Sequence, residues 1–228
     1  MKTLRPILCL SAAFMASMPV CHAVDLSANV TLATDYTFRG WSQTDEKGAI
    51  QGGFQADFDS GFYLGTWASN VNFGSDSDTS TEIDYFLGWS GALTDHLTLD
   101  INATFFAYDG DSAANYQEYG VALGWRGATL GLIYSDEYFG DGGPDFYYPY
   151  LGYEWAWVNG WGLSLHAGYN HTDESDFFVA GEKAYWDWSV GVHKTLQGID
   201  FALTYVDTDI SDVAAADARL IFSISKSF

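Results

Sequence analysis

The final eleven residues, ARLIFSISKSF (218–228), decide the fold of this chain. Leu220, Phe222 and Ile224 fall on one face of an extended strand, and three serines and an isoleucine fall on the other. Chain ends usually fray into water, so a water-soluble domain gains little from ending on an aromatic residue. The pattern therefore predicts that Phe228 belongs to a strand whose surroundings are apolar up to its last residue.

Residues 1–23, MKTLRPILCLSAAFMASMPVCHA, have the three parts of a secretory signal peptide. Lys2 and Arg5 precede an apolar stretch that is shorter than the roughly 20 residues of a spanning helix. The small residues at its end predict cleavage after Ala23. Cys21 raises the alternative of a lipoprotein, but the residues before it are not the small ones that a lipidation site requires, so cleavage is favoured.

Cleavage would leave a strongly acidic chain without cysteine. Both cysteines and two of the nine basic residues lie before residue 24, whereas all thirty acidic residues follow it. Because the two lost charges are both positive, the formal net charge changes from −21 to −23. The mature chain therefore has no disulfide and no zinc–thiolate site, and it does not bind nucleic acid through counterion release.

Segments with a two-residue apolar period follow one another along the remaining chain, with turn residues between them. We count roughly twelve, at 28–38, 49–58, 62–73, 82–93, 96–108, 118–125, 128–135, 146–157, 161–170, 185–194, 199–206 and 218–228. Within the eighth segment, Pro149 has no N–H for a ladder, so a bulge or a strand start near a rim is expected there.

The connections between these segments alternate in length. Short ones lie at 59–61, 94–95, 126–127, 159–160 and 197–198, and longer polar ones at 40–48, 74–80, 109–115, 136–145, 171–184 and 207–217. Tight turns on one rim and long loops on the other are typical of outer-membrane barrels. A soluble sandwich has no reason to alternate so regularly.

The apolar face of the segments is almost free of charge. Lys226 is the one charged residue that we place on it, near the chain end where a long side chain reaches the headgroups. Tyr and Trp gather near the strand ends, as in the aromatic girdles of membrane proteins. We therefore predict that residues 24–228 form one all-β domain, a transmembrane antiparallel up-and-down barrel of roughly twelve strands. Its last strand must pair with its first, because an open edge in lipid leaves backbone groups unpaired.

Four stretches of the chain resemble the TorF family of proteobacterial porins. They are ATDYTFRGWSQT (33–44), QGGFQADFDSGFYLGTWASNVNF (51–73), DWSVGVHKTLQGIDFALTYVDTD (187–209) and ADARLIFSISKSF (216–228). The resemblance implies an outer-membrane barrel with a pore function, without a settled solute or catalytic residues. Phe228 also resembles the C-terminal signal read by the barrel assembly machinery, with Lys226 as a mild departure from the usual pattern.

The positions between the apolar ones should face the lumen and are mostly acidic. They are Asp35, Asp57, Glu82, Asp84, Asp100, Glu118, Glu154, Asp187 and Asp200, opposed by Arg39, Arg126 and Arg219. Acidic walls in a narrow passage concentrate cations. The alternative is structural, since small barrels fill their interior with salt-bridged side chains. Arg39, paired with Asp35 or with an acid on a neighbouring strand, would be either a constriction or a packing contact.

Catalytic and metal sites find little support in the sequence. His166 and His193 fall on the inward faces of neighbouring strands, where they could meet, but such a pair more often belongs to a polar network. The run DTDISD (207–212) lacks the Gly and the terminal Glu of a calcium loop. No nucleotide-binding, hydrolase or metalloprotease motif occurs. We expect no enzyme, no cofactor and no dedicated metal site.

The function favoured by these observations is a narrow outer-membrane pore for small hydrophilic solutes or ions, with a preference for cations. Its surroundings would be outer-membrane lipid and lipopolysaccharide. The alternative is a non-conducting barrel whose acidic long loops bind divalent ions or a partner at the cell surface.

Overall fold

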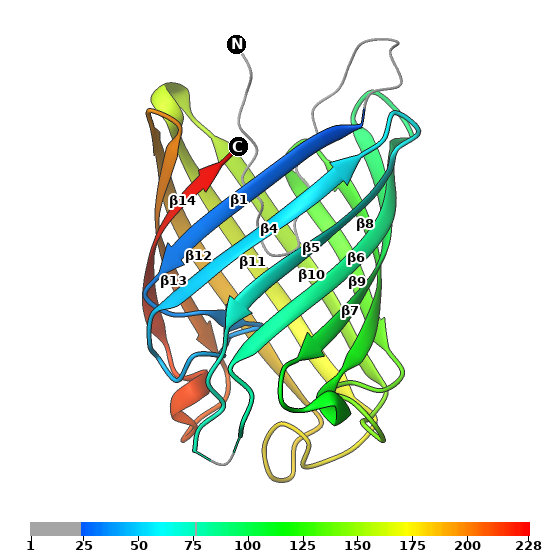
Figure 1. Cartoon of the computed structure of the whole chain (residues 1–228), viewed down its shortest axis with the longest axis vertical. Helices are drawn as coiled ribbons and strands as arrows, with labels where there is room; N and C mark the ends of the chain where they lie inside the picture. Colours follow the sequence, from blue (N-terminus) through cyan, green and yellow to red (C-terminus); the bar gives the residue numbers. More distant parts are fainter. Residues whose placement is uncertain (1–23, 76) are drawn as a thin grey trace.

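The structure is a computed structural model that describes residues 24–75 and 77–228. The predicted signal peptide, residues 1–23, lies outside the described residues. Twelve strands form one closed antiparallel barrel in which sequential strands are neighbours (Figure 1). They are β1 (Asp25–Ala33), β4 (Ala49–Asp57), β5 (Phe62–Asn70), β6 (Thr81–Ala92), β7 (Leu97–Tyr108), β8 (Tyr116–Trp125), β9 (Ala128–Ser135), β10 (Phe146–Ala156), β11 (Trp161–Thr172), β12 (Ala184–Leu196), β13 (Ile199–Thr208) and β14 (Arg219–Ser227). The predicted fold class is confirmed.

The barrel closes where the last strand meets the first. β14 pairs with β1 from Asn29 opposite Ser227 to Ala33 opposite Ser223. The pairing continues past the strand end, because the Phe228 N–H donates to the Ala28 carbonyl at 2.9 Å and the reverse bond measures 3.3 Å. The last residue is therefore part of the wall.

The two rims of the barrel differ as the sequence predicts. At the rim where the chain ends, which we call the short-turn rim, two-residue turns such as Gln197-Gly198 have φ of 53° and 74°, the left-handed pair that joins tight hairpins. The opposite, long-loop rim carries the long connections and the short 3-10 helices η1 (Ser112–Ala114) and η3 (Ala214–Ala216) (Figure 1). A third, η2 (Val158–Gly160), lies at the short-turn rim.

The outer surface of the wall is apolar and its interior is polar. Leu26, Phe54 and Leu220 are 74%, 68% and 63% exposed, whereas Glu82 and Glu118 are 2% exposed. This reverses the arrangement of a water-soluble domain, where a continuous apolar surface of this size is rare. It is the arrangement of a barrel whose wall lies in lipid. No helix among the described residues is long and apolar enough to cross a membrane.

Lys194 and Pro149 differ from the sequence expectations, the first about charge on the outer surface and the second about strand pairing. Lys194, at the end of β12, shares the outward face with Lys226, and its ammonium lies over the Trp161 ring at 5.1 Å near the short-turn rim. Pro149 lies inside β10 rather than at a bulge or a strand start. The ladder to β11 omits Tyr148 and Pro149 while keeping its register, so the missing N–H interrupts the pairing without shifting it.

The largest departure from the predicted elements follows β1. The sequence treats 28–38 as one strand with Tyr36 and Phe38 on the lipid face, but β1 ends at Ala33. Residues 34–48 then fold into the lumen as a small hairpin of β2 (Thr37–Phe38) and β3 (Trp41–Ser42), which we call the inserted hairpin. Tyr36 is only 4% exposed because its ring packs inside the barrel against Trp67.

Candidate pore and its constriction

The inserted hairpin has a tight tip that presses on the wall of the barrel. Phe38 pairs with Trp41, which leaves Arg39 and Gly40 as the two tip residues with φ of 49° and 85°. A Cβ at Gly40 would overlap the Thr208 side chain of β13, so only glycine fits there. The Tyr185 hydroxyl of β12 donates to the Arg39 carbonyl at 3.0 Å. These contacts seat the tip of the inserted hairpin against β12 and β13.

The base of the inserted hairpin is organised by Asp35. The hydroxyls of Ser42 and Thr44 both donate to Asp35 Oδ1, at 2.8 and 2.7 Å. Arg219, at the start of β14, donates to Asp35 Oδ2 at 2.9 Å. Asp35 thus pairs with Arg219 and not with Arg39, and it joins the hairpin to the seam of the barrel.

Arg39 forms a bidentate ion pair with Glu118 of β8. Its two terminal nitrogens lie 2.7 Å from the two carboxylate oxygens, and the side chains are 4% and 3% exposed. β8 is five strand-to-strand steps from β1 in a wall of twelve, so the ion pair connects opposite sides of the lumen. Fork-to-fork geometry of this kind is the strongest form of a charged hydrogen bond.

Aromatic rings surround the Arg39 guanidinium. Its central carbon lies 4.4 Å from the Phe38 ring centre, 4.6 Å from that of Phe146 and 4.5 Å from that of Tyr148. A terminal N–H of the same guanidinium donates to the Tyr138 hydroxyl at 3.2 Å. Tyr138 lies in the long loop 136–145, and burial raises the pKa of its hydroxyl, which therefore stays neutral beside the ion pair. Cation–π contacts of this kind gain strength when water is excluded.

Further aromatic residues fill the half of the lumen near the long-loop rim. Tyr138 stacks on Phe146 with ring centres 3.8 Å apart, and Phe106 stacks on Tyr116 at 4.5 Å. We call these four residues, with Phe38 and Tyr148, the aromatic plug. The loop residues Phe177 and Phe178 pack against it. The plug and the inserted hairpin make this half the narrow part of the lumen.

In the other half of the lumen, inward-facing glycines lie next to aromatic rings of neighbouring strands. A Cβ at Gly88 would overlap the Tyr63 ring, and one at Gly131 would overlap the Tyr150 ring. The Tyr63 hydroxyl donates to Asp100, with oxygen–oxygen distances of 3.0 and 3.1 Å. These glycines therefore leave room for the Tyr63 and Tyr150 rings beside the wall.

The narrow half of the lumen, which contains the inserted hairpin and the aromatic plug, is the constriction of the barrel. Its charged side chains include more acids than bases. Glu82 accepts a hydrogen bond of 3.0 Å from the Tyr36 hydroxyl, and the neighbouring inward Asp84 is 8% exposed. Asp84 Oδ1 has no hydrogen-bond partner among the described residues. The two arginines of this region, Arg39 and Arg219, are already paired with Glu118 and Asp35. Glu82 and Asp84 are therefore left without a basic partner in the part of the chain that the structure describes.

The two inward histidines do not meet. His166 lies opposite Ser189, whereas His193 lies opposite Gly162, four residues further along β11. His166 Nε2 is 2.6 Å from the Tyr148 hydroxyl, which also donates to Asp187 at 3.1 Å. Asn170 completes this network by donating to Asp187 at 2.8 Å. The contact that the sequence left open between His166 and His193 does not form, because the antiparallel register separates them, and His166 belongs to a polar network instead.

The remaining predicted lumen residues lie near the short-turn rim. Asp57 accepts a bond of 2.8 Å from Gln55, and Glu154 is half-buried on the inward face of β10. Arg126 lies in the turn between β8 and β9, exposed, with its guanidinium over the Trp125 ring at 5.4 Å. Arg126 is thus a rim residue, because the sequence period ends one position before it.

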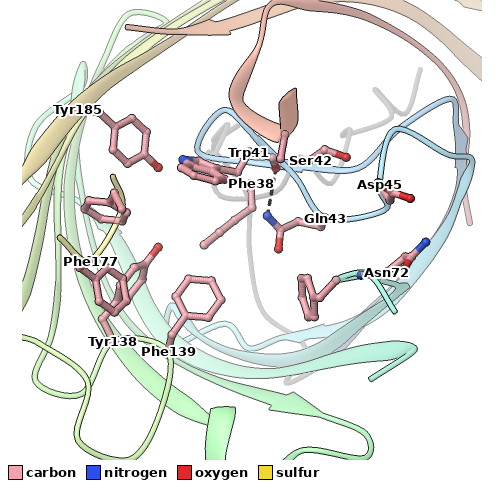
Figure 2. Close-up of a pocket in the computed structure, with 14 residues that line it drawn as sticks. Phe38, Trp41, Ser42, Gln43, Asp45, Asn72, Tyr138, Phe139, Phe177 and Tyr185 are labelled. Atoms are coloured by element: carbon pink, nitrogen blue, oxygen red, sulfur yellow. Dashed lines mark hydrogen bonds between the residues drawn. The ribbon is translucent and has the colours of Figure 1, made fainter. Parts of the chain in front are cut away.

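A cavity of about 410 Å³ opens on the long-loop side of the plug (Figure 2). We call it the aromatic cup, and its walls include Phe38, Trp41, Phe73, Tyr138, Phe177 and Tyr185. Sequence reasoning missed it because these residues come from five separate segments. The concentration of aromatic residues in polar loops was the available signal. No group of three or more metal-binding side chains occurs within the described ranges.

Comparison with known proteins places the chain among bacterial barrels. A family model described as a bacterial protein of unknown function (Gcw_chp) matches residues 19–228. No curated protein sequence matches the chain.

Among solved structures, the chain resembles the KdgM porin, with 8% identity, a TM-score of 0.58, and coverage of 89% of this chain and 99% of that one. A second KdgM structure, in complex with disordered oligogalacturonate, gives a TM-score of 0.59 at 8% identity and the same coverage. The NanC porin gives 0.57 at 9% identity, covering 88% of this chain and 98% of that one. At these identities the resemblance establishes the porin-like barrel fold alone.

Proposed function

Since the chain belongs to the Gcw_chp family of bacterial proteins of unknown function, we propose that it is an outer-membrane channel for passive diffusion of small hydrophilic solutes and ions, with a preference for cations. The observation that carries the proposal is a polar lumen, inside an apolar wall, whose constriction has an excess of carboxylates. Within the family, the four stretches quoted above support a TorF-type porin.

The charge of the constriction supports the cation preference. Each buried arginine is neutralised by its own carboxylate, so Glu82 and Asp84 set the sign of the local field. A narrow passage with low-dielectric walls concentrates ions of the opposite sign. Oligogalacturonate, present in one KdgM structure, carries a carboxylate on every unit, and the lumen of this chain is poorly matched to such an anion.

The apolar outer surface of the barrel supports an outer-membrane location. An apolar wall of this kind is stable in outer-membrane lipid, with the long loops outside the cell near lipopolysaccharide and the short turns in the periplasm. Residues 1–23 would direct export, and the terminal Phe228 would serve the barrel assembly machinery. The proposal assigns no catalytic role to the lumen carboxylates.

A non-conducting barrel is the second candidate. The specific observation in its favour is the aromatic plug, which occupies the long-loop half of the lumen together with the inserted hairpin. In that case the acidic loops would act at the cell surface by binding divalent ions or a partner.

Planar-bilayer recording of the purified protein separates the two candidates. We expect discrete conductance steps and a reversal potential on the cation side in a KCl gradient. A double variant, Glu82→Gln with Asp84→Asn, should reduce the cation preference, while Asp212→Asn in an exposed loop should leave it unchanged. An anion-selective reversal potential contradicts the charge preference. The absence of steps, in a protein whose folded state is verified, favours the non-conducting barrel.

A further inference from the structure

The aromatic cup has the composition of a site for a positively charged ligand. Eight of its fourteen lining residues are aromatic, and none is Lys, Arg or His. Figure 2 shows rings from the inserted hairpin, from the loop 136–145 and from the loop 173–183 arranged around one space. Its volume of about 410 Å³ lies within the range of small-molecule sites.

The polar groups of the cup add negative charge and no positive charge. They include the Asp45 carboxylate and the side-chain amides of Gln43 and Asn72. The Lys47 ammonium lies 2.7 Å from the Asp45 carboxylate. Because both side chains are more than half exposed, this ion pair is weak and well hydrated. Lys183 of the neighbouring loop is engaged with the Asp173 carbonyl.

The same aromatic cluster already holds one cation. The Arg39 guanidinium lies 4.4 Å from the Phe38 ring centre and 5.6 Å from that of Tyr138, and both rings also line the cup. Because Glu118 neutralises Arg39 through two short hydrogen bonds, the buried pair presents little net charge to the space above it. A second cation can therefore contact the Phe38 and Tyr138 rings without strong repulsion from Arg39.

An aromatic surface selects among cations by their hydration. A small, strongly hydrated metal ion loses more hydration free energy on leaving water than its contacts with aromatic ring faces supply. A quaternary ammonium group, in contrast, carries its charge on a weakly hydrated apolar surface. Cages of several aromatic rings are the usual protein solution for such groups. Trp41 also lines the cup, and its indole N–H is buried without a hydrogen-bond partner among the described residues.

We infer that the aromatic cup is a binding site for a small organic cation of the quaternary ammonium class, open to the outside of the cell. The inference takes the orientation of the barrel from the proposed function but does not require conduction. Binding in the cup would concentrate the cation directly above the constriction formed by Arg39 and Glu118.

Titration calorimetry on the protein purified in detergent micelles, at fixed ionic strength, tests the site. The probes are choline chloride and its neutral carbon isostere, 3,3-dimethylbutan-1-ol. We expect choline to bind and the alcohol to bind at least about tenfold more weakly, because only choline has the charge. Replacing part of the potassium in the buffer by sodium should not displace choline.

Matched variants locate the binding. Phe177→Ala should weaken choline binding by about fivefold, while Phe62→Ala at the short-turn rim should leave it unchanged. Asp45→Asn should weaken binding by about threefold and Asp212→Asn by less than about twofold. These two aspartates are matched because both are exposed and have left-handed backbones, with φ of 54° and 62°, which Asn tolerates. Gel migration before and after heating verifies that each variant is folded.

Three results would overturn the inference. Equal affinity for choline and for the alcohol would make the cup a neutral apolar pocket. Equal effects of Asp45→Asn and Asp212→Asn would assign the binding to diffuse surface charge, and absence of choline binding to the folded protein would remove the site. Choline binding by a protein that shows no conductance would leave the inference standing and contradict the channel.

Discussion

Arg39 and Glu118 lie 79 positions apart in the sequence and meet inside the barrel through two hydrogen bonds of 2.7 Å. One residue is at the tip of a hairpin that follows the first strand, and the other is on the opposite wall. The pair therefore links the inserted hairpin, residues 34–48, to the opposite wall across the lumen.

Removing one member of this pair should be costly. Glu118→Gln leaves the Arg39 guanidinium buried without its counter-charge, and we expect a loss of about 3–5 kcal/mol in the free energy of unfolding. Urea unfolding in micelles, followed by tryptophan fluorescence, measures it. The control is Lys47→Ala, which breaks the exposed pair with Asp45 and should cost less than about 1 kcal/mol. Similar losses for the two variants would show that the Arg39–Glu118 pair does not hold the hairpin.

Gly40→Ala should displace the tip of the inserted hairpin. The new methyl group would overlap the Thr208 side chain, so the hairpin must retract and we expect a larger single-channel conductance. Gly142→Ala is the control, since Gly142 also has a positive φ, 77°, but a Cβ there meets nothing within 4 Å. The control carries the backbone cost alone. If both variants conduct as the unmodified protein does, the tip does not limit the pore.

Gly65→Ala should destabilise the wall. A Cβ at Gly65 would overlap both the Phe54 carbonyl oxygen, which cannot move freely, and the Phe86 ring. We expect a loss of about 1–3 kcal/mol in unfolding free energy, as for other overpacked sites. Gly152→Ala faces the same lumen, but its nearest neighbour is 3.8 Å away, and it should be neutral or slightly stabilising. The difference between their urea midpoints measures the effect, and equal midpoints would contradict it.

Asp109 should make the loop before β6 sensitive to acid. The backbone N–H groups of Ser80 and Thr81 donate to its carboxylate at 2.8 and 2.7 Å, and they lower its pKa below the ordinary 3.8. A carboxyl group whose pKa is lower in the folded state than in the unfolded state stabilises the fold at pH values above its unfolded-state pKa. This stabilisation is lost as the pH falls through the folded-state pKa. The loop contacts should therefore persist to about pH 4 and weaken below it.

A carboxyl titration by NMR in micelles measures the Asp109 pKa directly. The Asp109→Asn variant should lose the acid-dependent change in the Ser80 and Thr81 amide signals, while Asp95→Asn in a short turn should retain it. A folded-state pKa of Asp109 at or above 3.8 would contradict the assignment.

The wall of the barrel was predictable because its rule is local. Alternation of apolar and polar residues needs only neighbouring positions, and it located the twelve strands and both kinds of connection. The inserted hairpin was not predictable in this way, since Tyr36 and Phe38 continue the apolar period of β1 although their rings pack inside the barrel. The alternation of apolar and polar residues indicates that a side chain avoids water. It does not indicate whether lipid or the aromatic plug surrounds that side chain.

The partners within the lumen depended on information that the alternation does not contain. Arg39 was expected beside Asp35 or a neighbouring strand, yet its carboxylate comes from the opposite wall, at a height set by the register of the whole sheet. The same register separates His166 from His193 by four residues along β11. The aromatic cup required aromatic residues of five separate segments to be placed together, which no single stretch of sequence specifies.

The seam between β1 and β14 has a consequence for biogenesis. Its contacts join positions separated by as many as 194 residues, as in the bond between the Thr31 and Ser225 hydroxyls. Until residue 228 emerges, there is no enclosed interior for residues 34–48 to enter, although they are made early. The hairpin must wait for nearly the whole chain, and its docking is expected to be the last and slowest event in maturation.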